Sequence, residues 1–171
     1  MTNRSQWWCT MLAASLFFCL PHFARGQEAA GQPAGRNLAQ MKFDTVPGLP
    51  TCALSSVQSG DPTKGPSIIL AKVPAGCLVP WHWHTPNEHL MIVSGVARLE
   101  VKDGKPLTLR AGGFAMMPSR HVHQFRCTTA CTFFIDSDAA FDIHYVDAQG
   151  KELAPDDALK AVRETAAKPM K

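Results

Sequence analysis

The chain has 171 residues, a length that suits one ordinary domain rather than two. Apolar residues make up 46% of it and charged residues 18%, so a packed core is expected and an intrinsically disordered protein is excluded. The 17 basic residues exceed the 14 acidic residues by only three, and they form no cluster. We therefore expect no nucleic-acid partner.

The first 26 residues have the composition of a secretory signal peptide. Arg4 precedes an apolar stretch from Thr10 to Leu20, and Ala24 and Gly26 are small residues at a suitable cleavage point. The uninterrupted apolar run is too short for a transmembrane helix, which needs about 20 residues. We predict cleavage after Gly26, export to the periplasm or the medium, and no stable membrane insertion.

Residues 27–48 are rich in Gly, Gln, Ala and Pro, which predicts a flexible leader or an arm that lies on the domain. Residues 49–153 carry short β patterns separated by turn residues, which predicts an all-β antiparallel sandwich or barrel. Asp103-Gly104 is a hairpin signal. Residues 154–171 predict a short C-terminal helix and tail. The expected strands include Ser67–Val73, Glu88–Val93, Ala97–Lys102, Leu107–Arg110, Phe114–Met117, His123–Arg126, Cys131–Ile135 and Phe141–Val146.

Four cysteines follow the predicted signal peptide, an even number that suits an oxidising compartment. Cys127 and Cys131 flank a short turn between two expected strands, so their side chains can meet across it. We predict a disulfide between these two, with Cys52 and Cys77 forming the second pair. The alternative is four free thiols.

A group of histidines and a glutamate has the spacing of a metal site. His82 and His84 are two residues apart in an expected strand, so their side chains share one face. Glu88 begins the next strand after a turn and can return beside them. These residue types suit one divalent transition metal: Fe, Mn, Zn, Ni or Co. His121 and His123 share strand parity, so spacing alone leaves open which one completes the site.

The chain resembles the cupin family over roughly residues 50–146. The first cupin motif, G-x5-H-x-H-x3-E-x6-G, is matched at every defined position. Its residues here are Gly76, His82, His84, Glu88 and Gly95. The resemblance implies a double-stranded β-helix, or jelly-roll barrel, with a metal bound by the two histidines and the glutamate of this motif.

The second cupin motif, G-x5-P-x-G-x2-H-x3-N, is matched in part. Gly112, Pro118 and His123 fit it, so the resemblance implies that His123 is the fourth metal ligand. Arg120 replaces the glycine of the motif and Cys127 replaces its asparagine. Because glycine often occupies backbone positions that other residues find strained, the turn can differ here, and His121 remains the substitute ligand.

Three apolar side chains are expected to line the barrel interior near the metal. Leu90 and Ile92 share strand parity with Glu88, and Phe125 shares it with His123. A small-molecule ligand or substrate would therefore enter a largely apolar space, with few polar groups to hold it apart from the metal.

The resemblance implies two functions. The first is a metal-dependent dioxygenase or isomerase acting on a small oxygen-bearing organic molecule chelated to the metal, with Glu88 or a metal-bound water as the catalytic base. The alternative is a non-catalytic periplasmic protein that binds a metal or a small ligand. Trp81 and Trp83 alternate with the histidines and should form an exposed pair on the outer face. Such a pair suggests subunit contact, and we predict a homodimer.

Overall fold

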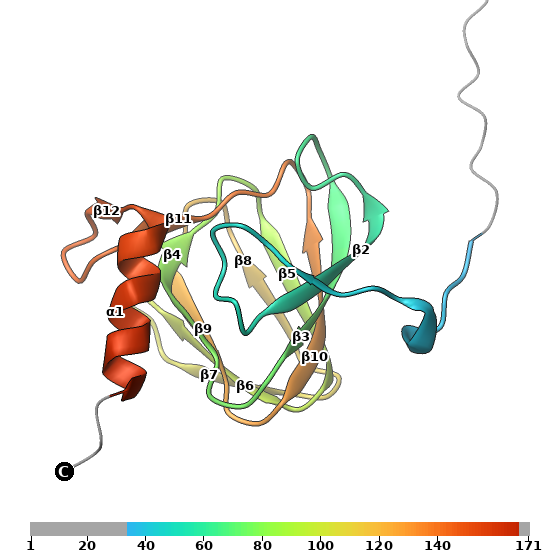
Figure 1. Cartoon of the computed structure of the whole chain (residues 1–171). Coiled ribbons are helices and arrows are strands. Elements are labelled where there is room, and N and C mark those ends of the chain that lie inside the picture. Colours follow the sequence, from blue (N-terminus) through green and yellow to red (C-terminus); the bar gives the residue numbers. More distant parts are fainter. Residues whose placement is uncertain (1–33, 168–171) are drawn as a thin grey trace, which may run out of the picture. The chain divides into compact units, whose positions relative to one another are not determined.

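The structure is a computed structural model that describes residues 34–167, so the predicted signal peptide lies outside the described residues. The described part is built from two antiparallel six-stranded sheets followed by one α-helix (Figure 1). A 3-10 turn, Leu38–Gln40, and the two-residue strand β1 lie within the predicted leader. Within residues 34–167, no helix has both the length and the apolar character needed to cross a membrane.

The first sheet has the strand order β1-β2-β3-β10-β5-β8, and the second has the order β12-β11-β4-β9-β6-β7. The strands of the first sheet are β1 (Asp44–Thr45), β2 (Leu54–Gly60), β3 (Ser67–Val73), β5 (Glu88–Ser94), β8 (Phe114–Met117) and β10 (Cys131–Ser137). Those of the second sheet are β4 (Leu78–Trp83), β6 (Val96–Val101), β7 (Leu107–Arg110), β9 (His123–Cys127), β11 (His144–Val146) and β12 (Glu152–Leu153).

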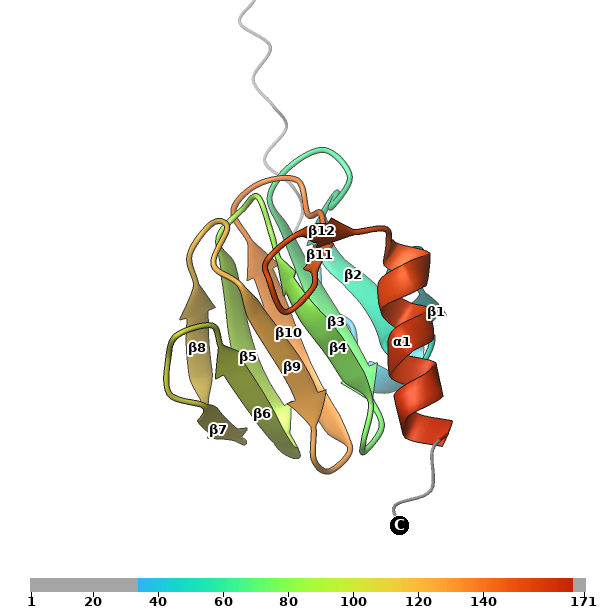
Figure 2. The ribbon, with the colours of Figure 1, turned by 90° about the vertical axis from the view of Figure 1, so that its left-hand side faces the viewer.

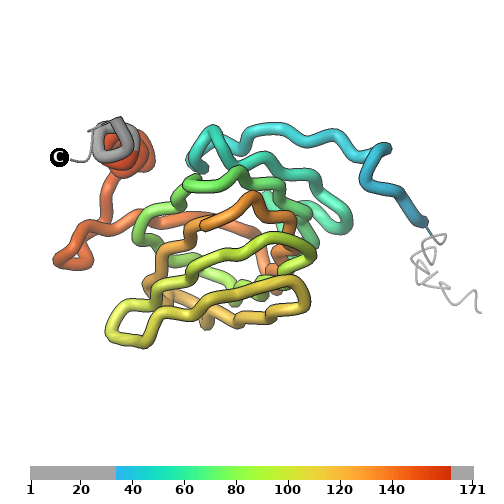
Figure 3. The backbone as a smooth tube through the Cα atoms, turned by 90° about the horizontal axis from the view of Figure 1, so that it is seen from below, coloured from blue at the N-terminus to red at the C-terminus, as the bar shows by residue number. Residues whose placement is uncertain are grey.

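The core lies between the two sheets, because alternate side chains of each strand point inward. Buried members of this core include Ala71, Leu90, Leu99, Phe125 and Phe133. The helix α1 (Pro155–Ala167) lies outside the barrel, beside β4 and β11 (Figures 2 and 3). This arrangement confirms the predicted all-β jelly-roll barrel with a short C-terminal helix.

The hairpin predicted at Asp103-Gly104 joins β6 to β7. Asp103 adopts a positive φ of 60°, and the Gly104 amide donates to the Val101 carbonyl at 3.1 Å. The strand expected over Phe141–Val146 is shorter than predicted, because only residues 144–146 form a strand, in which His144 and Tyr145 pair with β4. Residues 139–143 instead form a loop that contributes to the site described below.

The structure contains a Cys52–Cys77 disulfide, but Cys127 and Cys131 are free thiols, so the predicted second disulfide is wrong for this structure. The two residues belong to strands of different sheets, since Cys127 pairs with Ala97 and Cys131 with Val73. Both are buried and pack as small apolar groups, and burial raises the pKa of the Cys127 thiol.

The Cys52–Cys77 disulfide should make a large contribution to stability. It closes a loop with a sequence separation of 25 residues, for which loop-closure entropy predicts about 3.5 kcal/mol. We expect the Cys52→Ala/Cys77→Ala double variant to lose about this much free energy of unfolding in urea. A reducing agent should destabilise the wild type similarly and leave the double variant unchanged; equal destabilisation of both proteins would contradict this assignment.

Candidate metal centre

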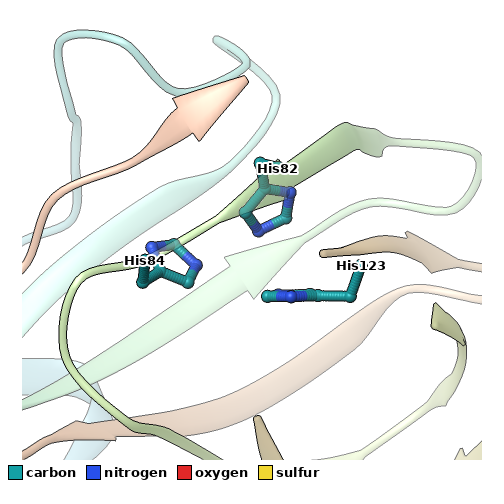
Figure 4. Close-up of side chains that lie close together, drawn as sticks. All are labelled: His82, His84 and His123. Carbon is teal, nitrogen blue, oxygen red and sulfur yellow. The ribbon is translucent and has the colours of Figure 1, made fainter. Parts of the chain in front are cut away.

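Three imidazoles converge inside the barrel from two adjacent strands. His82 and His123 are directly paired across β4 and β9, and His84 follows at the end of β4. Their closest ligand nitrogens all lie within 4.8 Å of one another, and each residue is at most 3% exposed (Figure 4). The imidazole rings of His82 and His123 are 4.2 Å apart between centroids. The strand register therefore brings together histidines 41 residues apart in sequence.

Glu88 adds a carboxylate to the three imidazoles. It is the first residue of β5 and is 4% exposed. Its Oε2 atom lies 3.3 Å from His123 Nε2, and its Oε1 atom lies 3.7 Å from His84 Nε2. The β4–β5 turn that the sequence places after His84 thus returns the carboxylate to the imidazoles, and the four side chains form one buried group.

Each imidazole contacts a backbone carbonyl through its Nδ1 atom. The partners are Pro80 for His82 at 2.6 Å, His121 for His123 at 2.8 Å, and Asp142 for His84. A carbonyl oxygen can only accept a hydrogen bond, so each Nδ1 carries the proton. In a neutral imidazole the Nε2 atom then presents a lone pair, which is the form that binds a metal.

Burial keeps the imidazoles of His82 and His84 neutral. It lowers the pKa of His82 well below its usual value, and the neighbouring imidazoles lower it further. Burial also lowers the pKa of His84, although the Glu88 carboxylate opposes this change. For Glu88, burial alone would raise the pKa, but the nearby His84 and His123 outweigh it, and the pKa is lowered. The donor set therefore comprises the neutral imidazoles of His82 and His84, the imidazole of His123 and the ionised carboxylate of Glu88.

The group presents acceptor atoms with no donor between them. Within the described residues, His84 Nε2 and Glu88 Oε2 are buried without a hydrogen-bond partner. Leaving such atoms unpaired costs roughly 1–3 kcal/mol each on mutational scales. A cation among them would satisfy all of these lone pairs at once. Three imidazole nitrogens and a carboxylate are a suitable first shell for a divalent transition metal, so the residues fit this group.

The other predicted site residues have different positions. His121 is exposed and contributes its backbone carbonyl rather than its imidazole, so it lies outside the ligand group. Leu90 and Phe125 line the cavity beside the ligands, as expected from parity. Ile92 is buried in the core but does not border the cavity, so the prediction that it lines the site is wrong.

The prediction of an exposed tryptophan pair is wrong for Trp83, which is only 8% exposed, while Trp81 is half-buried. The indole of Trp83 stacks on the ring of His144, with centroids 3.8 Å apart and an interplanar angle of 3°. The Arg120 guanidinium lies over the same indole at 4.7 Å. Neighbouring side chains thus cover Trp83 on the outer face of the sheet.

Sequence reasoning missed three residues of the 141–145 region. Phe141 packs its ring 4.5 Å from that of His84, and Asp142 supplies the carbonyl for His84 Nδ1. The Tyr145 ring lies 6.0 Å from the His82 ring, and its hydroxyl donates to the Gly48 carbonyl at 2.8 Å. The pairing of β11 with β4 places all three here, and no spacing motif in the sequence encodes that pairing.

Comparison with known proteins supports the fold. The family model of the cupin domain matches residues 69–135. No curated protein matches the chain significantly. The polyketide cyclase RemF from Streptomyces resistomycificus is similar in structure, with a TM-score of 0.64 and 14% identity over 77% of this chain and 94% of that one.

Two further solved structures are also similar. A candidate acetylacetone dioxygenase from Methylibium petroleiphilum has a TM-score of 0.58 and 16% identity over 74% of this chain and 90% of that one. An RmlC-like cupin from Ralstonia eutropha has a TM-score of 0.56 and 19% identity over 82% and 93%. At these identities the likeness concerns the fold. The matched domain model identifies residues 69–135 as a cupin domain, and the shared barrel agrees with it.

Proposed function

We propose that this protein binds one divalent transition metal through His82, His84, Glu88 and His123, and uses it as an exported dioxygenase or isomerase on a small oxygen-bearing molecule. The observation that carries the proposal is the buried group of lone pairs, in which His84 Nε2 and Glu88 Oε2 lack a partner. Such a group is costly in a metal-free core and favourable around a cation. Iron, manganese, zinc, nickel and cobalt all accept this donor set.

The chemistry of the site suits a Lewis acid. His82, His84, Glu88 and His123 would hold the metal, which would supply a Lewis acid for a carbonyl or enolate oxygen of the substrate. The chain itself supplies orientation: three backbone carbonyls fix the imidazoles, and the apolar lining excludes water. Glu88 is the single carboxylate among the cavity-lining residues, so it is the candidate base. The names of two structural relatives, a cyclase and a candidate dioxygenase, also favour an enzyme.

The alternative is a non-catalytic protein that binds a metal or a small ligand. It is favoured by the small number of polar groups around the cavity, where Ser55 is the one polar lining residue besides the four proposed ligands. No second acid or base therefore borders the cavity within the described residues. Oxygen uptake by the iron-loaded protein, measured with oxygen-bearing molecules that range in size from formate to diketones and catechols, and with thiols, distinguishes the two functions.

Export is part of the proposal, and the disulfide supports it. Disulfides persist in oxidising compartments such as the periplasm and are rare in the cytosol. The Cys52–Cys77 bond lies within the domain, and the apolar stretch near the N-terminus has the length and flanks of a signal peptide. N-terminal sequencing of the protein secreted from its host cell tests cleavage after Gly26.

We also propose a homodimer, formed through the outer face of the first sheet rather than through the tryptophans. Along β5, inward-facing residues such as Glu88 and Leu90 alternate with residues on the outer face of the sheet. On that face Phe114 is 60% exposed, Met116 47% and Val93 51%, and Ile68 adds 38%. Three of these groups lie on the adjacent strands β5 and β8, and exposed apolar groups so placed are typical of a subunit contact.

Metal binding should depend on the ligand group and not on the other histidines. We expect the His82→Ala variant to bind Zn²⁺ at least about 100-fold more weakly than the wild type, because it loses a ligand from a buried first shell. His89→Ala is the matched control, since His89 is on the outer face of β5 and contacts Asp136 instead. Calorimetric titration and elemental analysis measure the effect. A wild type that binds no metal on reconstitution contradicts the proposal.

The metal-free protein should lose stability in mild acid. The folded-state pKa values of His82 and His84 lie below the usual value of 6.5, so the unfolded chain binds protons first as the pH falls. The free energy of unfolding should therefore be highest above pH 6.5 and fall below it by about 1.4 kcal/mol per pH unit for each histidine. Urea unfolding at pH 7.5 and pH 5.5 measures this. His82→Gln should reduce the pH dependence; equal stability of the wild type at both pH values contradicts the assignment.

The proposed subunit contact predicts a specific change of mass. We expect the wild type to elute as a dimer and the Phe114→Ser/Met116→Ser variant as a monomer in size-exclusion chromatography with light scattering. Leu107→Ser is the control, because Leu107 is 43% exposed but belongs to β7 of the second sheet. A dimer that survives the double substitution on β8 would place the contact elsewhere.

A further inference from the structure

The cavity beside the metal ligands is small. Its volume is about 50 Å³, whereas pockets for drug-sized ligands span roughly 300–1,000 Å³. A water molecule needs roughly 10–15 Å³ of such space, so the cavity has room for about four water-sized groups, and the metal between its ligands would take the place of one of them. In this conformation the metal can therefore take a very small additional ligand, but not a bulky one.

The lining gives a ligand almost nothing to bind except the metal. Apart from the four ligands, Ser55 is the one polar lining residue, and the others are alanine or larger apolar side chains. A molecule with several hydroxyl or charged groups would lose its hydration there without replacement. By contrast, a divalent ion and the Glu88 carboxylate together leave one positive charge. A small monoanion would neutralise it, and a small neutral molecule would lose little hydration.

Two segments separate this cavity from solvent. Leu49, Phe141 and Ile143 line it, and all three are only half-buried, so they lie between the cavity and the surface. Phe141 packs against His84, and its amide donates to the Pro62 carbonyl at 2.8 Å. Leu49 belongs to residues 46–53, which we call the strap. In Figure 1 the strap crosses the front of the barrel before it enters β2.

The strap is fixed at several points. The Tyr145 hydroxyl, on a residue that is 1% exposed, donates to the Gly48 carbonyl at 2.8 Å. Gly48 adopts a positive φ of 81°, and a side chain there would also approach Ile143. The Cys52–Cys77 disulfide ties the end of the strap to the start of β4. Leu49 is thus held over the cavity by a covalent bond and a buried hydrogen bond.

We propose that the strap limits the metal of this protein to additional ligands of up to about three non-hydrogen atoms, such as dioxygen, azide or formate, with Leu49 as the residue that sets the limit. The inference rests on the proposed metal binding and narrows its ligand class. Larger chelating molecules, such as pentane-2,4-dione, are excluded while the strap is closed. A shorter side chain at position 49 enlarges the cavity without removing a metal ligand.

The test uses the Co²⁺-loaded protein, whose visible absorption reports each change in metal coordination without any need for catalysis. Wild type and Leu49→Ala are titrated with azide and with pentane-2,4-dione. We expect azide to bind both proteins with similar affinity. We expect pentane-2,4-dione to bind Leu49→Ala at least about tenfold more tightly than the wild type, a difference of about 1.4 kcal/mol.

Leu54→Ala is the matched control, because Leu54 follows the strap, is 36% exposed and does not line the cavity. It should bind both molecules as the wild type does. Ile143→Ala removes a second lining side chain and should reproduce the effect if Leu49→Ala disturbs the fold. Tight binding of pentane-2,4-dione to the cobalt-loaded wild type overturns the size limit alone. A protein that takes up no Co²⁺ overturns the proposed function and the inference with it.

Discussion

Three hydrogen bonds from imidazole Nδ1 atoms to backbone carbonyls fix the orientation and the tautomer of the histidines in the candidate metal centre. Two of the carbonyls are local, because Pro80 and His121 each precede their histidine by two residues. The third belongs to Asp142, 58 residues away, and it orients His84. Each bond is worth about 0.5–1.5 kcal/mol by itself, but together they place every proton on the outer side of the rings. The inward lone pairs, and hence the affinity for a cation, follow from that placement.

The turn before His123 shows how the fold accommodates an unusual residue. Arg120 occupies the glycine position of the second motif and adopts a φ of 62°, a conformation that costs a side-chain residue roughly 1–2 kcal/mol. Its amide donates to the His84 carbonyl at 2.8 Å, so the turn is retained. The guanidinium covers Trp83. Such a contact contributes about 0.5–1 kcal/mol at exposed sites, which offsets part of the conformational cost.

The parts of this protein that the sequence predicts are those governed by local geometry. Strand parity separates the ligands His82 and His84 from Trp81 and Trp83, and turn chemistry identifies the hairpin at Asp103. The motif register distinguishes His123 from His121, whose side chain the structure places outside the ligand group.

The features that the sequence could not predict depend on contacts between distant segments. The loop that orients His84 is reached only through the pairing of β11 with β4. The covering of Trp83 depends on the same pairing, because His144 lies directly opposite it. Cys127 and Cys131 are separated by three residues and their side chains interact in the core, yet both remain free thiols, so proximity did not predict a bond.

The metal site and the mouth of its cavity are built from different elements, and this separation has a consequence for specificity. The four proposed ligands come from β4 and the residue after it, β5 and β9, whereas the mouth comes from the strap and the loop before β11. The loop before β11 both lines the mouth and orients a proposed ligand, because Phe141 is next to Asp142, whose carbonyl accepts from His84 Nδ1. A substitution in this loop would therefore also affect metal binding. The strap holds none of the three Nδ1 atoms. An apolar cavity discriminates among ligands mainly by volume, at about 1–3 kcal/mol per methylene. The strap is therefore the segment at which ligand size can change while the ligand geometry is retained.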